Sequence, residues 1–224
     1  PPTMIALAEQ YGVQFLYGAV VRKGDLTYNS VVLLNPSLEK GEVYHKHRLV
    51  PFVEYFPLEE QLNRFLELDL LLGSYSPGQE ITIFPVNQAQ VAGVICFESY
   101  FGDHTRSFAL KGADHLFVLT NDAWFKDSIG LDMHAQVAAI RAAETGRGVT
   151  QVANSGITVS FDHRGKELFR LPINEPLTTS TIIDLTGRDT LYIRWGDFLP
   201  LLALLILAGG FAAGLLRRAT LKNL

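Results

Sequence analysis

One short segment combines cationic side chains and a carboxylate within an apolar stretch. The segment Tyr44–Leu58 reads YHKHRLVPFVEYFPL, and Lys46 and Glu54 stand on either side of its apolar run LVPF. A charged group beside side chains that are expected to be buried needs a partner of opposite charge. We therefore interpret Lys46 and Glu54 as parts of a site, against the alternative that the segment is a solvated loop.

The only cysteine of the chain stands at the end of a second apolar run. Cys96 closes the string VAGVIC, and Glu98 follows shortly after it. Such a string is typical of a strand buried on both faces, and α/β folds place their sites where strands end. A thiol has an ordinary pKa of about 8.5, so a nucleophilic cysteine needs a nearby cation that favours the thiolate. Lys46 is the candidate cation, and the alternative is that Cys96 only packs as a small apolar side chain.

A third segment, TNDAWF at Thr120–Phe125, also follows a predicted strand. Its aromatic residues Trp124 and Phe125 either line an apolar path into a site or pack in the core, and the pattern does not separate the two. We expect Asn121, together with Asn154, to satisfy backbone groups near the site.

Composition and charge exclude several classes of function. The net charge of −4 gives no general attraction to nucleic acid, and a single cysteine cannot form an internal disulfide. His45 and His47 flank Lys46 at a spacing that we do not interpret as a metal site, and we expect His134 to be structural. We predict neither a metal nor a cofactor.

The elements that must position these groups alternate between strand and helix, which predicts one layered α/β domain over residues 1–190. We predict helices at Leu58–Leu70, Asp103–Lys111 and Met133–Thr145, with Asp132 as N-cap of the last. A turn at 163–166 should join the last predicted strand pair. Strands are predicted at Gln14–Val21, Ser30–Leu34, Val91–Phe97, His115–Thr120, Val149–Ala153, Ile157–Phe161, Leu168–Leu171 and Ser180–Leu185.

The end of the chain carries a long apolar run. Phe198–Leu216 contains no charged residue, and as a helix it would extend about 28 Å, close to the thickness of a bilayer core. We predict a transmembrane helix there, with a buried core helix as the alternative. The basic residues after it predict a cytoplasmic tail over 217–224, a linker over 191–197, and a domain on the opposite face of the membrane.

Four segments together resemble a known family. YHKHRLVPFVEYFPLE, GVICFESYFGD, LTNDAWF and RAAETGRGVTQVANSGITV resemble the carbon–nitrogen hydrolase (nitrilase) superfamily and, within it, the apolipoprotein N-acyltransferases of the bacterial envelope. The resemblance covers residues from about 14 to the C-terminus. It implies a four-layer αββα sandwich and a Glu–Lys–Cys triad.

The resemblance also assigns roles to individual residues. It implies that Cys96 is the nucleophile and Lys46 the triad lysine, with Glu54 and Glu98 as supporting acids. Phe97 stands where tyrosine is common, and its backbone amide is expected to contribute to an oxyanion hole. Val53 stands where the family usually has glycine. The family's general-base glutamate is expected before Pro1, so the chain is interpreted as a C-terminal catalytic part.

The function implied is transfer of a fatty acyl group through a cysteine thioester. The donor is a phospholipid, and the acceptor is the N-terminal diacylglyceryl-cysteine of a lipoprotein. The expected location is the bacterial cytoplasmic membrane, with the catalytic domain on its periplasmic face. Two alternatives remain open: a membrane-tethered amidase of the same superfamily, and an inactive fragment that binds lipoproteins.

Overall fold

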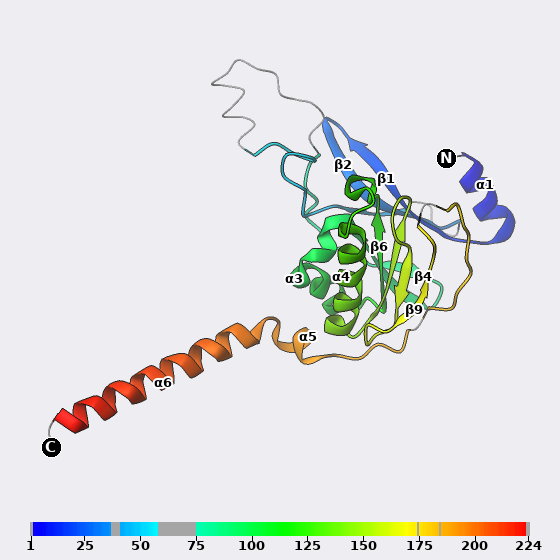
Figure 1. Cartoon of the computed structure of the whole chain (residues 1–224). Coiled ribbons are helices and arrows are strands. Elements are labelled where there is room, and N and C mark those ends of the chain that lie inside the picture. Colours follow the sequence, from blue (N-terminus) through cyan, green and yellow to red (C-terminus); the bar gives the residue numbers. More distant parts are fainter. Residues whose placement is uncertain (1, 37–40, 58–74, 174, 184, 223–224) are drawn as a thin grey trace, which may run out of the picture.

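The computed structural model describes residues 2–36, 41–57, 75–173, 175–183 and 185–222, and the side chains of the last helix as far as residue 214. The helix predicted at Leu58–Leu70 lies outside the described residues. Two β-sheets form the body of the described fold (Figure 1).

The first sheet is an antiparallel three-stranded sheet. It consists of β1 (Phe15–Lys23), β2 (Leu26–Leu34) and β3 (Glu42–His45), in that order. Gly24 and Asp25 join β1 to β2, and Gly24 adopts a φ of 59°, which glycine reaches without steric cost. Val31 and Leu33 of β2 are fully buried, so this sheet presents one face to the core.

The second sheet has six strands in sequence order. The strands are β4 (Phe84–Val86), β5 (Ala89–Ile95), β6 (His115–Thr120), β7 (Gly148–Ala153), β8 (Val159–Phe161) and β9 (Glu167–Arg170). The pairs β5–β6 and β6–β7 are parallel, whereas the outer pairs are antiparallel. The near-continuous apolar sequence of β5 follows from this position, because both faces of the strand are covered.

The two sheets pack face to face with helices on the outer side. Gly93 of β5 lies so close to β2 that an added Cβ would stand 2.7 Å from a methyl carbon of Val31. Helices α3 (Gly102–Leu110) and α4 (Gly130–Thr145) cover the other face of the six-stranded sheet (Figure 1). The described residues thus form a helix–sheet–sheet sandwich, which confirms the predicted α/β class and accounts for three of the four predicted layers.

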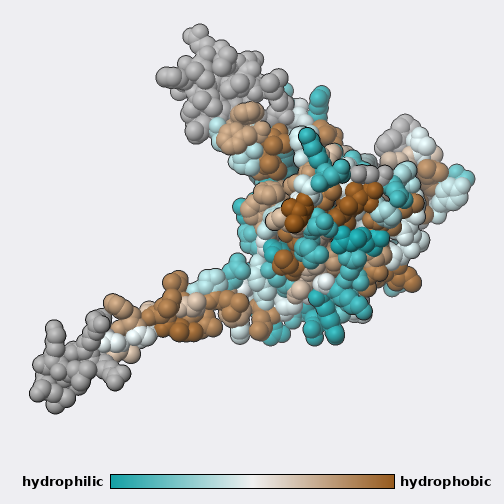
Figure 2. Space-filling model, viewed as in Figure 1, coloured by the Kyte–Doolittle hydropathy of each residue, from teal (hydrophilic) through white to brown (hydrophobic). Residues whose placement is uncertain are grey.

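Helices at both ends of the chain extend from this sandwich. α1 (Pro2–Tyr11) precedes the first sheet, and the short helix α5 (Leu191–Trp195) leads into α6 (Phe198–Lys222). α6 projects away from the body (Figure 1), and most of its apolar side chains are exposed as far as residue 214, where their description ends (Figure 2). Among the described residues, no helix combines the length and the apolar character that a bilayer crossing requires, so the predicted span is not confirmed.

Two local predictions are wrong. Residues 180–183 and 185 form no strand, and Ile182 is 93% exposed, since no neighbouring strand pairs with this apolar stretch. Asp132 is not an N-cap, because α4 begins at Gly130 after Ile129, which leaves Asp132 in the first turn. The predicted strand pair and turn near 163–166 are confirmed as the β8–β9 hairpin.

Candidate active site

Cys96 stands where strand β5 turns into a short 3-10 helix, η1 (Cys96–Tyr100). Its φ is 50°, a left-handed conformation that is uncommon for a residue with a side chain. Such a conformation persists only where the surroundings hold it, and it recurs at functional sites. The side chain is half-buried, so the turn presents the thiol at the carboxyl end of a central strand.

The carboxylate of Glu98 holds this turn. Glu98 is fully buried, and its Oε2 accepts a hydrogen bond from the backbone amide of Ile95 at 2.9 Å. Its Oε1 accepts hydrogen bonds from the amides of His47 (2.7 Å) and Arg48 (3.1 Å) and from the hydroxyl of Tyr44 (2.8 Å). One carboxylate therefore ties the turn at Cys96 to the loop that carries Lys46.

The surroundings keep Glu98 ionised. Burial by itself would raise its pKa, but the hydrogen bond and charge of His104 and the amides of Ile95 and Arg48 together bring that pKa below its ordinary value. Burial and the neighbouring Glu98 carboxylate raise the pKa of Tyr44 far above its ordinary value, so Tyr44 stays a phenol and a donor.

Lys46 is fixed in a comparable way. It is 1% exposed, and its Nζ lies 2.7 Å from Oε2 of Glu54. Glu54 also accepts hydrogen bonds from the amide of Val50 (2.8 Å) and from Nδ2 of Asn29 (2.9 Å). An ion pair with this many additional hydrogen bonds fixes the direction of the ammonium group.

Lys46, Glu54 and Cys96 line one cavity of about 830 Å³. It opens at the carboxyl ends of the parallel strands β5, β6 and β7, where α/β sheets commonly bind ligands. Trp124, which is 76% exposed, and Phe125 lie on its lining, and Phe125 also packs against the core. A role for them as a path for an acyl chain stays a prediction. The apolar wall of the cavity is completed by Leu16, Val50, Val53, Ile95, Leu119 and Val152.

The electrostatic surroundings of Cys96 favour the protonated thiol. Burial is the main cause that raises its pKa above the ordinary value, and the carboxylate of Asp122 adds to the effect. The positive charge of Lys46 and a hydrogen bond from the amide of Phe97 act in the opposite direction without outweighing burial, as would a hydrogen bond donated by Thr120. Attack by this sulfur therefore requires a base that takes the thiol proton.

A buried polar chain behind Cys96 was missed in the sequence analysis. Asp122 is 1% exposed, and its Oδ1 accepts hydrogen bonds from Thr120 Oγ1 at 2.6 Å and from His134 Nδ1 at 2.9 Å. His134 is fully buried, and its Nε2 lies 3.1 Å from Ser99 Oγ and 3.3 Å from the carbonyl oxygen of Cys96. The sequence signal that could have pointed to this chain was Asp122, an acidic residue placed directly after a predicted strand in TNDAWF.

The remaining polar residues from the sequence analysis lie at or near the site. Asn154 lines the cavity, and Asn121 accepts a hydrogen bond from the amide of Ala123. His45 contacts the hydroxyl of Ser30 and stacks on Tyr28. The described part of the chain contains no group of acidic, histidine or cysteine side chains arranged to hold a metal ion.

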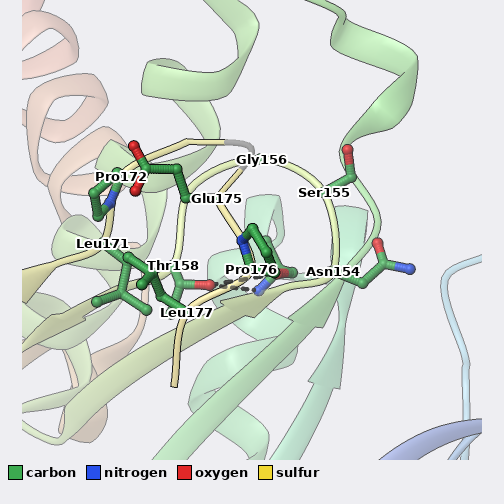
Figure 3. Close-up of a pocket in the computed structure, with 10 residues that line it drawn as sticks. Asn154, Ser155, Gly156, Thr158, Leu171, Pro172, Glu175, Pro176 and Leu177 are labelled. Carbon is green, nitrogen blue, oxygen red and sulfur yellow. Dashed lines mark hydrogen bonds between the residues drawn. The ribbon is translucent and has the colours of Figure 1, made fainter. Parts of the chain in front are cut away.

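A second cavity of about 460 Å³ adjoins the first and shares Ala153 and Asn154 with it. Figure 3 shows its lining, in which Thr158 makes a hydrogen bond to the backbone of Ala153. None of the residues with predicted catalytic roles lines this second cavity.

Comparison with known proteins gives a family and several relatives. The sequence model of the family described as Carbon-nitrogen hydrolase matches residues 3–195. The apolipoprotein N-acyltransferase of Pasteurella multocida is 33% identical over 98% of this chain and 44% of the relative. The apolipoprotein N-acyltransferase of Nitrosomonas europaea is 37% identical over 87% of this chain and 39% of the relative. The chain thus spans less than half the length of these curated relatives.

Solved structures share the fold at lower sequence identity. A carbon-nitrogen hydrolase from Helicobacter pylori superposes with a TM-score of 0.62 and 14% identity, covering 78% of this chain and 63% of that chain. A Nesterenkonia amidase from the nitrilase superfamily superposes with a TM-score of 0.58 and 17% identity, covering 76% and 62%. At these identities the likeness supports the nitrilase-like fold alone.

Proposed function

This chain belongs to the carbon–nitrogen hydrolase family, and from that premise we propose that it is the catalytic part of an apolipoprotein N-acyltransferase. The reaction moves a fatty acyl group from a phospholipid to the α-amino group of the N-terminal diacylglyceryl-cysteine of a lipoprotein. The observation that carries the proposal is the single cavity in which Cys96, Lys46 and Glu54 meet an apolar wall.

In the first half-reaction, the sulfur of Cys96 attacks the ester carbonyl of the phospholipid. A carbon–sulfur bond forms, the ester oxygen leaves as the alcohol of a lysophospholipid, and the thiol proton is returned to that oxygen by way of a base. We expect the family's glutamate to be this base, and we assign it to no residue of this sequence. The product is a thioester on Cys96.

Lys46 and the amide of Phe97 are suited to stabilise the oxyanion of this step. The Phe97 amide donates a hydrogen bond to the Cys96 sulfur, and therefore lies beside the carbon that the sulfur attacks. Lys46 interacts electrostatically with Cys96 while Glu54 holds its ammonium group. Donors that are already oriented need no rearrangement as negative charge develops on the carbonyl oxygen.

In the second half-reaction, the amine of the acceptor attacks the thioester. The carbon–nitrogen bond forms, the carbon–sulfur bond breaks, and the amine proton returns to the sulfur by way of the same base. Water would compete with the amine, and apolar wall residues around Cys96 reduce its access. The same wall provides a surface against which acyl chains are buried.

We extend the proposal to the membrane. Leucine residues such as Leu204 and Leu207 of α6 are 63% and 69% exposed, an arrangement unfavourable in water and favourable in lipid (Figure 2). α6 would anchor the chain to the bacterial cytoplasmic membrane, with the catalytic domain on the periplasmic face. Removal of 198–224 should abolish flotation of the chain with phospholipid vesicles, and unchanged flotation would contradict the anchor.

The catalytic proposal is tested by trapping the thioester. The complete enzyme is incubated with labelled phospholipid and no acceptor, and the peptide containing Cys96 is analysed by mass spectrometry. An acyl adduct that neutral hydroxylamine releases is expected on Cys96 and not in Cys96→Ser. Addition of a diacylglyceryl-cysteine peptide should move the label to that peptide. An unmodified Cys96 in an enzyme that turns over would refute the proposal.

Amide hydrolysis is the second candidate, because solved structures that share this fold include an amidase. The chemistry at Cys96 would be similar, but water would resolve the thioester and ammonia would leave in the first step. An amidase should release ammonia from short amides and form no lipid adduct. The apolar wall of the cavity favours the acyltransferase.

A further inference from the structure

The buried chain Thr120–Asp122–His134 lies directly behind the candidate nucleophile and has no place in the steps above. A negative charge buried beside a reacting thiol is costly unless it is compensated. Among the described residues, Asp122 Oδ2 has no hydrogen-bond partner, so the compensation of this carboxylate comes only through Oδ1. A group retained at this cost beside Cys96 suggests a role in the chemistry.

The position of Asp122 is held from several sides. His134 donates from Nδ1 to Asp122 Oδ1, since an ionised carboxylate only accepts, and Nε2 of the same ring lies against the carbonyl oxygen of Cys96. The free oxygen faces Gly156, whose φ is 112°, and a Cβ at that position would stand 3.1 Å from Asp122 Oδ2. Asp122 is thereby kept in place.

Thr120 connects the carboxylate to the thiol. A hydrogen bond donated by its side chain would lower the pKa of Cys96, but its hydroxyl lies 2.6 Å from Asp122 Oδ1 and donates to that oxygen. A hydroxyl has one hydrogen, and the short contact with a carboxylate commits that hydrogen to Asp122. The oxygen of Thr120 therefore faces Cys96 with a lone pair, which accepts a hydrogen bond from S–H and gives none to a thiolate.

We propose that Asp122 is a positioning residue that keeps Cys96 as a protonated thiol until the catalytic base removes the proton. Its charge opposes a thiolate, and its capture of the Thr120 hydrogen removes a donor that a thiolate would need. Other charged or titratable groups lie near Cys96, and the test must separate Asp122 from them. They are Lys46, Glu54, Glu98, Tyr100 and His134.

The resting thiol has a physical advantage in a cavity of this kind. A free thiolate beside an apolar wall would carry an uncompensated charge and would react with any electrophile that enters. A thiol that loses its proton only when base and ester are both in place reacts with the substrate alone. The inference rests on the proposed role of Cys96 as nucleophile.

The test measures the acidity of Cys96 and does not need the lipid substrates. The rate of alkylation by iodoacetamide is followed against pH at the Cys96 peptide by mass spectrometry. The pH midpoint reports the acidity of the thiol, whereas a change in access changes only the plateau rate. Asp122→Asn should lower the midpoint by about one pH unit, which corresponds to about tenfold faster alkylation at pH 7.

Three further variants make the result specific. Thr120→Val should lower the midpoint by a smaller amount, because S–H loses its acceptor, and Thr120→Ser should leave it unchanged. Asp127→Asn removes an exposed charge from the same loop and is the matched control. Thr120→Val keeps the carboxylate, so it carries the test alone if Asp122→Asn does not fold.

An unchanged or higher midpoint in Asp122→Asn, or an equal shift in Asp127→Asn, would overturn the proposal. A higher midpoint in Thr120→Val would mean that the hydroxyl donates to the thiolate, and would overturn it as well. The alkylation assay uses no lipid, so a result that overturns the role of Asp122 leaves the acyltransferase proposal standing. Conversely, if no lipid thioester forms on Cys96, the acyltransferase proposal fails while the measured acidity of Cys96 stays valid.

Discussion

Replacement of Glu98 by glutamine tests whether one buried carboxylate holds the site together. The substitution preserves shape but turns one oxygen into an NH2 group. If the remaining oxygen takes the place of Oε1, it keeps the amides of His47 and Arg48 and the hydroxyl of Tyr44, and the NH2 then faces the amide of Ile95. The NH2 group and the Ile95 amide are both donors, so the hydrogen bond between these positions is lost. The buried amide of Ile95 is then left without an acceptor.

The size of the effect follows from these contacts. A hydrogen bond to a charged group contributes about 1.5–3 kcal/mol, and an unpaired buried donor costs about 1–3 kcal/mol. We therefore expect Glu98→Gln to lower the free energy of unfolding by about 3–5 kcal/mol at pH 7. That is a large part of the roughly 5–15 kcal/mol that stabilises a typical domain.

The pH dependence gives a second check on the same variant. The folded-state pKa of Glu98 lies below its ordinary value of 4.5, so the carboxylate contributes stability that is present above pH 4.5. That contribution is lost as the pH falls through the lower folded-state pKa. The free energies of unfolding of the native protein and of Glu98→Gln should therefore differ most near neutral pH and converge in acid.

Urea unfolding followed by tryptophan fluorescence at neutral and acidic pH measures both quantities. Glu167→Gln is the control, because Glu167 is an exposed partner of Arg170, and it should change the free energy of unfolding by less than about 0.5 kcal/mol. A loss below about 1 kcal/mol in Glu98→Gln, or a difference that does not shrink in acid, would refute the reasoning.

Three further variants probe the site and the sheet packing. Lys46→Arg replaces a compact ammonium with a planar fork beside Glu54, so acyl transfer by the complete enzyme should fall by about two orders of magnitude; near-normal turnover would remove Lys46 from the site. Cys96→Ala should abolish transfer while leaving the urea midpoint nearly unchanged, and retained transfer would show that Cys96 only packs. Gly93→Ala pushes a methyl group against Val31, so the free energy of unfolding should fall by about 1–3 kcal/mol; an unchanged value would mean that the two sheets separate readily.

Long apolar strands were predictable because their pattern is local. His115–Thr120 was predicted with the bounds that β6 has, and the run VAGVI forms most of β5. β3 and β4 escaped prediction because each is short, and β4 includes Pro85, which removes a hydrogen-bond donor and is tolerated at a sheet edge. The stretch Ser180–Leu185 has the composition of a strand. A strand forms only where another strand pairs with it, and the local sequence does not indicate whether such a partner is present.

Residues with an unusual local setting were the ones that the sequence could single out. Lys46 and Glu54 were singled out as charges beside an apolar run, and the structure joins them in a buried ion pair. The links among distant residues were not predictable. Glu98 binds backbone amides at His47 and Arg48, and backbone groups carry no signal in a sequence. The catalytic roles themselves remain predictions.

The anchoring of Cys96 and the lining of its cavity come from different side chains, which has a consequence for how such a protein can diverge. Hydrogen bonds from within the fold hold the turn at Cys96, whereas Leu16, Val53 and Val152 contribute bulk to the wall. Mutations in the wall can lengthen, shorten or reshape the space without moving the sulfur. Related proteins can therefore come to accept different substrates through single substitutions in the cavity wall, while the reaction at Cys96 stays the same.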